Sequence, residues 1–202
     1  MENTKTKYIA KVAILSALAT VVMFIETPIP FMPPFLKLDL SELIVLLGAF
    51  AMGPVAGILI ELIKNLVHVA FTITGGIGEL ANFIVGCAFV VPAAIIYKRN
   101  KNIKTAIIGL IVGSISMVII STFMNYLVII PLYIKIFAEQ FGMTFDQSLQ
   151  SIVESGAQKN SGIIDFKTLI LFGIVPFNAI KVIIISILTF ITYKKVSPIL
   201  HK

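Results

Sequence analysis

The chain has 202 residues, of which 58% are hydrophobic and only 13% are charged, and its mean hydropathy is +1.02. Soluble domains carry about 25% charged residues, so this composition excludes a water-soluble domain and predicts an all-α membrane protein. A single cysteine, Cys87, excludes a disulfide framework, and with only two distant histidines the sequence gives no indication of a metal site.

Six apolar runs are long enough, or nearly long enough, to cross a bilayer as helices, which takes roughly 20 residues. The expected spans are about residues 8–25, 38–52, 54–71, 79–97, 105–130 and 167–193. The second run is short, and Gly53 and Pro54 separate it from the third. The sequence therefore predicts a single integral membrane domain, residues 1–202, with six transmembrane helices.

The first span carries small residues at helical spacing, because Ala13 and Ala17 are four residues apart and Val21 follows one turn later. Faces of small residues allow helices to approach closely. This face fits either a contact with another subunit or ordinary packing inside the chain. Gly109 and Gly113 in the fifth span are candidates for the same kind of close packing.

Two of the segments that connect the spans have an unusual composition or length. The segment between the first two spans is rich in proline from Pro28 to Pro34 and cannot be helical throughout. The segment Leu132–Phe166 is long for a loop, and long loops are often functional. Within it we expect a short surface helix around Asp146–Val153.

Lysine and arginine gather near the ends of the spans, and cytoplasmic loops carry an excess of these residues. The three basic clusters are Lys5, Lys7 and Lys11; Lys98, Arg99, Lys101 and Lys104; and Lys194, Lys195 and Lys202. With six spans, all three clusters fall on one side of the membrane. Both termini are therefore expected in the cytoplasm, and the net charge of +6 is explained without a nucleic-acid partner.

A first group of polar residues lies inside the third span, where Glu61, Lys64, Asn65 and His68 share one helical stripe. Ionisable groups inside spans are expensive and usually face a partner or a cavity. Glu61 and Lys64 can cancel each other's charge, and Glu42 of the second span can join them. The group fits a buried network that holds two spans together, with direct contact to a ligand or an ion as the alternative.

A second group is spread over three spans at a similar depth. Its members are Glu79 and Asn82 in the fourth span, Asn125 in the fifth, and Asn178 and Lys181 in the sixth. Convergence of a carboxylate, amides and an ammonium from separate helices is typical of a ligand pocket, here one that opens outward. The alternative is structural: Glu79 pairs with Lys181, and the asparagines bridge neighbouring helices.

The residue types limit what such a pocket would bind. Asparagine offers donors and acceptors that read the edge of a heterocycle, while one lysine without an arginine cluster argues against a multiply charged phosphate. Apolar walls would come from Phe35, Leu36, Leu38, Met124 and Phe177. We therefore expect a neutral, partly aromatic, polyhydroxylated ligand.

Five stretches in order along the chain resemble one known family. They are FLKLDLSEL (Phe35–Leu43), GPVAGILIELIKNLVH (Gly53–His68), GELANFIVG (Gly78–Gly86), NYLVIIPLY (Asn125–Tyr133) and PFNAIKV (Pro176–Val182). Together they resemble the riboflavin-specific S component of energy-coupling factor (ECF) transporters, from about Tyr8 to Tyr193. The resemblance implies a six-helix subunit in the cytoplasmic membrane of a bacterium that binds the vitamin without being an enzyme.

The resemblance also implies partners and site residues. A transmembrane T component and two ATPase subunits would supply energy, which agrees with the absence of a P-loop motif from this sequence. Ala13, Ala17 and Val21 would dock on the T component. The residues implied to bind riboflavin are Glu79, Asn125, Asn178 and Lys181, with Asn82, Met124 and the segment Phe35, Leu36, Lys37, Leu38 and Asp39 beside them. No cofactor and no metal is expected.

Two alternatives remain at the level of the sequence. One stays within transport: an S component for flavin mononucleotide, whose phosphate Lys181 would meet, or for another vitamin. The other class is a membrane-embedded lipid-modifying enzyme, but the sequence shows no aspartate-rich motif and no serine–histidine pairing for such chemistry.

Overall fold

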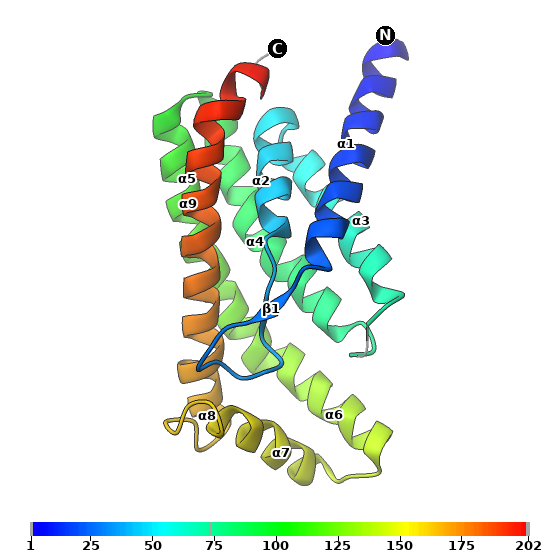
Figure 1. Ribbon diagram of the computed structural model, residues 1–202, viewed down its shortest axis with the longest axis vertical. Helices are drawn as coiled ribbons and strands as arrows, with labels where there is room; N and C mark the ends of the chain where they lie inside the picture. Colours follow the sequence, from blue (N-terminus) through cyan, green and yellow to red (C-terminus); the bar gives the residue numbers. More distant parts are fainter. Residues whose placement is uncertain (1, 73, 201–202) are drawn as a thin grey trace.

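The computed structural model describes residues 2–72 and 74–200, which form a helical bundle closed at one end by shorter helices (Figure 1). The elements in chain order are α1 (Glu2–Met23), β1 (Thr27–Pro28), β2 (Lys37–Leu38), α2 (Ser41–Met52), α3 (Pro54–Val69), α4 (Ile77–Arg99), α5 (Ile103–Met124), the π-helical turn η1 (Asn125–Ile129), α6 (Ile130–Phe141), α7 (Phe145–Ala157), α8 (Phe166–Leu169), the π-helical turn η2 (Ile170–Ile174) and α9 (Val175–Leu200).

Among the described residues, four helical runs are long and apolar enough to cross a membrane: Thr4–Met23, Ile77–Arg99, Ile103–Phe141 and Phe166–Tyr193. The helical membrane fold expected from the sequence is therefore present. The second and third expected spans correspond to α2 and α3, which have 12 and 16 residues and are shorter than the roughly 20 that a span needs. They meet at Gly53, whose positive φ of 98° favours glycine at this break.

The run from α5 to α6 is longer than one span. Its 39 residues would reach about 58 Å as a straight helix, about twice the hydrocarbon thickness. The π turn η1 and Pro131 interrupt it, and α6 turns away across the end of the bundle (Figure 1). The expectation of a long loop over residues 132–166 was therefore wrong, because α6 and α7 fill most of it. The short surface helix expected within this segment is confirmed as part of α7.

The main hydrophobic core lies between α1, α2, α3, α4, α5 and α9. Helices α4 and α5 pack closely because a Cβ atom at Gly109 would lie 2.6 Å from the carbonyl oxygen of Ala93, and one at Gly113 would lie 2.5 Å from that of Phe89. The close packing predicted for these two glycines is confirmed.

A second, separate core lies between α6, α7, α8 and η2. It contains Ile134, Ile152, Ile163 and Leu169, all fully or nearly fully buried. At the start of α8, backbone and side-chain hydrogen bonds from Thr168 to Asp165 hold the pKa of that exposed carboxyl below its usual value. The second core makes α6 and α7 a packed layer across the end of the bundle.

The proline-rich segment forms a short hairpin, in agreement with the prediction that it is not helical throughout. Strands β1 and β2 are antiparallel, with Thr27 opposite Leu38 and Pro28 opposite Lys37. Lys37 also forms an ion pair with Glu26. The hairpin ends two residues before α2 and lies between α1 and the layer of α6 and α7 (Figure 1). Asp39 follows the hairpin directly and its side chain is buried.

Candidate functional site

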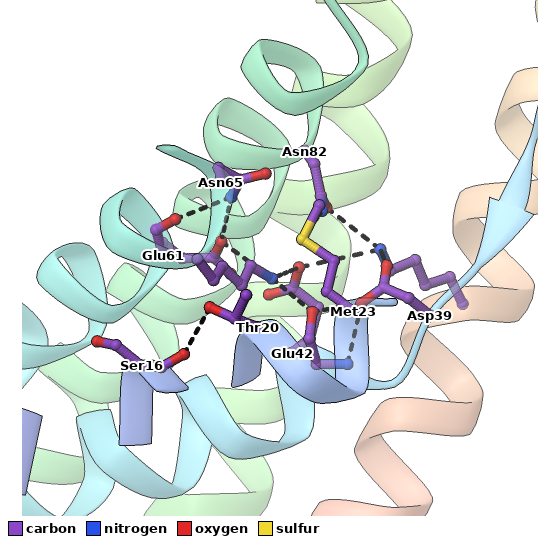
Figure 2. Close-up of polar contacts among 11 residues, drawn as sticks. Ser16, Thr20, Met23, Asp39, Glu42, Glu61, Asn65 and Asn82 are labelled. Carbon is purple, nitrogen blue, oxygen red and sulfur yellow. Dashed lines mark hydrogen bonds and ion pairs between the residues drawn. The ribbon is translucent and has the colours of Figure 1, made fainter. Parts of the chain in front are cut away.

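Lys181 on α9 lies at the centre of one polar cluster, which we call the Lys181 cluster: Asp39, Asn82 and Lys181. Its Nζ atom donates to Oδ2 of Asp39 at 3.0 Å and to Oδ1 of Asn82 at 3.4 Å (Figure 2). All three come from different segments, and the Lys181 and Asp39 side chains are 6% exposed. The predicted neighbourhood of Asn82 and Lys181 is confirmed.

The sequence also allowed a purely structural arrangement in which Lys181 pairs with Glu79. The structure does not contain this pair among the described interactions. The actual partner is Asp39, expected only as part of a loop over the site. Oδ1 of Asp39 accepts hydrogen bonds from the backbone N–H and the hydroxyl of Ser41. An aspartate that accepts from a backbone two residues later is a common turn before a helix, so the signal lay in the stretch DLSE before α2.

A second cluster lies next to it in the interior, which we call the Lys64 cluster: Ser41, Glu42, Glu61, Lys64 and Asn65. Nζ of Lys64 lies 2.7 Å from Oγ of Ser41, 2.8 Å from Oε1 of Glu42 and 3.1 Å from Oε2 of Glu61. Nδ2 of Asn65 donates to Oε2 of Glu61 at 3.1 Å. The sequence correctly predicted that Glu61 pairs with Lys64 and that Glu42 joins them.

His68 was expected on the same stripe but leaves this cluster. Its Nδ1 atom lies 2.8 Å from Oε1 of Glu79 on α4, whose other oxygen accepts from the Thr74 hydroxyl at 3.3 Å. The Phe24 ring packs on the imidazole, with ring centroids 4.8 Å apart. The contact between His68 and Glu79 was not predicted, because the periodicity of α3 gives no information about contacts with another helix.

Asn125 and Asn178 each stand at a π-helical turn. Nδ2 of Asn125, the first residue of η1, donates to the carbonyl oxygen of Ser121 at 2.8 Å. Nδ2 of Asn178 donates to that of Ile174, the last residue of η2, at 2.9 Å. Turns of this kind occur often at functional sites. Both side chains are buried, but no contact joins either of them to Lys181 or Glu79 among the described interactions.

The predicted apolar walls lie in different places. Phe35 and Leu36 pack against the second core, where the rings of Phe35 and Tyr133 stack with centroids 6.5 Å apart. Phe177 is buried on α9, Met124 is half-buried at the end of α5, and Leu38 is paired with Thr27 in the hairpin. The segment 35–39 therefore joins the outer helical layer to the Lys181 cluster.

An apolar surface cleft of about 320 Å³ lies beside the two π turns. It is lined by Thr122, Phe123, Tyr126, Lys167, Ile170 and Leu171. None of these residues was predicted to contact the ligand, although three of them lie within four positions of Asn125.

The chain matches one protein family and several characterised relatives. Residues 7–193 match the family described as ECF transporter, substrate-specific component. The chain is 38% identical over 198 residues to the riboflavin transporter RibU of Staphylococcus aureus (strain TCH60), covering 98% of this chain and 94% of that protein. It is 31% identical over 199 residues to the riboflavin transporter FmnP of Bacillus subtilis (strain 168), covering 96% and 94%.

A solved structure agrees with these relationships. The structure presented as "Structure and mechanism of the S component of a bacterial ECF transporter" superposes with a TM-score of 0.75 at 36% identity and covers 98% of this chain and 99% of that one. The resemblance drawn from the five sequence stretches is thereby confirmed. The chain belongs to the family of substrate-specific components, or S components, of ECF transporters.

Proposed function

We propose that this chain binds riboflavin near the end of the bundle that faces away from the cytoplasm and carries it across the cytoplasmic membrane as the S component of an ATP-driven transporter. The relatives named as riboflavin transporters, aligned over nearly the whole chain, support this substrate. The observation that carries the proposal is the cluster in which α4, α9 and the 35–39 segment meet at Lys181.

The electrostatics of this cluster favour a neutral ligand. Lys181 is buried, and its charge is compensated by Asp39 at 3.0 Å, with Glu42 at 3.9 Å. Its ammonium protons remain useful as donors to carbonyl or hydroxyl oxygens, but no excess positive charge is left for a phosphate. We infer that flavin mononucleotide binds more weakly than riboflavin, because its phosphate would need a charge partner.

We propose that the ligand lies between the Lys181 cluster, the Glu79 carboxylate, and the amides of Asn125 and Asn178. The segment Phe35–Asp39, with Met124 nearby, covers it from the hairpin side. Helices α6 and α7, packed against Phe35 and Leu36, form the layer outside. In this arrangement, riboflavin forms hydrogen bonds with the side-chain amides of Asn125 and Asn178, which do not bond to each other.

The arrangement of the helices supports one orientation in the membrane. We infer six membrane crossings, residues about 8–25, 38–52, 54–71, 79–97, 105–130 and 167–193, within a single domain. In Figure 1, α1 begins, α5 begins and α9 ends at one end of the bundle, and α6 and α7 lie at the other. The first end carries the basic clusters, which supports cytoplasmic termini. The side chains of residues 194–202 lie outside the described part of the chain.

The chain itself is a binding subunit rather than an enzyme, and we propose that a T component and two ATPase subunits complete the transporter. Ala13, Ala17 and Val21 are all exposed along one face of α1, as a docking surface requires. Their small side chains would let a helix of the T component approach closely.

Quenching of flavin fluorescence by the purified chain tests the substrate. We expect riboflavin to bind at micromolar or lower concentration, flavin mononucleotide to bind more weakly, and thiamine, as a control vitamin, not to bind. Riboflavin that fails to bind in this range would contradict the proposal, and tighter binding of flavin mononucleotide would shift it to that ligand. Uptake of labelled riboflavin in cells lacking their own importer, with and without the partner subunits, tests transport.

A further inference from the structure

The Lys64 cluster contains more acidic than basic groups, and it adjoins the Lys181 cluster. Together they hold the carboxyl groups of Asp39, Glu42 and Glu61 and the ammonium groups of Lys64 and Lys181, linked by contacts of 2.8 to 3.9 Å. If every group were ionised, one negative charge would remain uncompensated. The Glu42, Glu61 and Lys64 side chains are 0% exposed, so water does not stabilise that charge.

Among the described residues, no further cation contacts these two clusters. Next to the cluster, α1 presents the uncharged side chains of Ser16, Thr20 and Met23 (Figure 2), and α4 presents Asn82 and the thiol of Cys87. The ionisable groups of His68 and Glu79 contact each other at 2.8 Å. Lys37 at the hairpin is paired with Glu26.

Two carboxylate oxygens in the cluster lack a hydrogen-bond partner. Glu42 uses Oε1 for Lys64, and Glu61 uses Oε2 for Lys64 and Asn65. The remaining oxygens, Oε2 of Glu42 and Oε1 of Glu61, are buried and have no partner. Both carboxyl groups contact the same ammonium, Nζ of Lys64, at 2.8 and 3.1 Å. Two ionised carboxylates held on one buried ammonium repel each other, whereas a neutral carboxyl beside a carboxylate does not.

The backbone of α4 closes the site on one side. A Cβ atom added at Gly86 would lie 2.5 Å from Oε1 of Glu61 and 3.1 Å from Oε1 of Glu42. The backbone at Gly86 therefore packs directly against the carboxyl group of Glu61.

We propose that Glu42 and Glu61 bind one proton between them, so that the buried charges of the two clusters sum to zero. The proton belongs to the pair rather than to either glutamate alone. It is bound in the interior of the α2, α3 and α4 packing, independently of whether riboflavin is the ligand. The site is thus a proton-binding site in the core of the S component, and its occupant is chemically distinct from the transported vitamin.

Infrared spectroscopy of the purified chain tests this directly. At neutral pH we expect one C=O stretching band of a protonated carboxylic acid, shifted in D₂O. Glu61→Gln and Glu42→Gln should each abolish the band, because the remaining carboxylate then pairs with Lys64 alone. The exposed Glu139→Gln is the matched control and should retain it. A wild-type spectrum without the band, or a band that persists in both glutamine variants, would overturn the proposal.

Thermal unfolding supplies a second test. Each single glutamine variant replaces a shared proton with a neutral amide and should keep the midpoint temperature of unfolding, Tm, close to that of the wild type. The double variant leaves Lys64 without a carboxylate and should lower Tm by roughly 10 °C. If the Tm of a single variant fell as far as that of the double variant, this result would contradict a shared proton.

The same measurement distinguishes a proton from a metal ion without any substitution. Tm should be equal in sodium chloride and in choline chloride at the same ionic strength and pH. A rise specific to sodium would assign the site to that cation and refute the proton.

Discussion

At the scale of single residues, Lys181 shows how a buried charge is compensated and still able to donate. Its Nζ atom contacts Asp39 and Asn82 at 3.0 and 3.4 Å, so an ammonium placed in the membrane interior is not left unpaired. The longer of these two hydrogen bonds is the weaker one. We infer that a ligand oxygen replaces or shares the contact with Asn82 while Asp39 keeps the charge balanced.

This arrangement gives the first prediction, for Lys181→Ala and Asn125→Ala. Each should raise the Kd for riboflavin about 10- to 100-fold, because loss of one partner leaves a buried polar group unsatisfied, at a cost of about 1–3 kcal/mol. Flavin fluorescence quenching measures the affinity. Asn100→Ala, exposed at the opposite end of α4, is the control and should bind normally. Unchanged affinity in both test variants would mean that the site is elsewhere.

Loss of Lys181 also leaves Asp39 as a buried charge, which can destabilise the fold. The double variant Asp39→Asn with Lys181→Met removes both charges and separates the two effects. We expect its Tm to recover relative to Lys181→Ala while riboflavin binding stays weak. Recovery of binding together with Tm would assign Lys181 a purely structural role.

His68 gives a second prediction at this scale. It holds one oxygen of Glu79 at 2.8 Å, so we assign it the role of a positioning residue for that carboxylate. His68→Ala should weaken riboflavin binding about 10-fold through the lost hydrogen bond. His68→Gln, which can still donate to Glu79, should restore much of the affinity. Equal affinities of the alanine and glutamine variants would show that the hydrogen bond does not position Glu79.

At the scale of elements, α1 has one buried face and one exposed face. Ser16, Ala19, Thr20 and Met23 are buried against the bundle, whereas Ala13, Ala17 and Val21 are exposed. An exposed row of small residues on a helix that already packs with its other face suits a second helix from outside the chain.

The third prediction concerns this face. Ala13→Trp should leave riboflavin binding intact, because the residue points away from the bundle, but should block assembly with the T component through steric clash. Co-purification with the partner subunits and uptake of labelled riboflavin measure the effect. Leu18→Trp, exposed elsewhere around the same helix, is the matched control and should assemble. Normal assembly of Ala13→Trp would contradict the docking role.

The elements also show what the sequence could and could not predict. Local periodicity correctly placed Glu61 next to Lys64, because both lie on α3 three residues apart. It could not pair Lys181 with Asp39, since 142 positions separate them and only the folded hairpin brings them together. The helix α6 was not predicted, although Ile130, Ile134 and Ala138 recur every four residues and are buried.

The two π turns were not predicted from the sequence either. The irregular turn before Asn178 is η2, which ends at Ile174, and Nδ2 of Asn178 donates to the carbonyl oxygen of Ile174. Composition and spacing do not distinguish a π turn from a regular α-helical turn. The apolar run was therefore recognised as a helix, while its local geometry was not.

At the scale of the whole molecule, the two hydrophobic cores divide the chain into a bundle and a layer across one end. The bundle core contains residues from the long helices, and the second core joins α6, α7 and α8 to the segment at Phe35 and Leu36. In a membrane, this places the layer at one surface and the start of α1 and the end of α9 at the other (Figure 1). The helix pair α2 and α3 decides how many times the chain crosses.

Cysteine labelling can distinguish six crossings from four crossings with α2 and α3 inserted from the outer side as a re-entrant pair. The background is Cys87→Ala, which removes the native thiol. Lys101→Cys in the link between α4 and α5 and Lys159→Cys after α7 mark the two ends, and Val55→Cys, 63% exposed, marks the junction of α2 and α3. We expect a membrane-impermeant maleimide added to intact cells to label only Lys159→Cys.

After permeabilisation, Lys101→Cys and Val55→Cys should both react, because six crossings place the α2–α3 junction at the cytoplasmic surface with the basic link. The α2–α3 junction is the critical position because α2 and α3 have only 12 and 16 residues. Helices this short bring the junction to the cytoplasmic surface only if the hairpin between α1 and α2 spans part of the membrane thickness. A junction cysteine that never reacts would show a re-entrant pair and four crossings. Labelling of Lys101→Cys in intact cells would reverse the orientation.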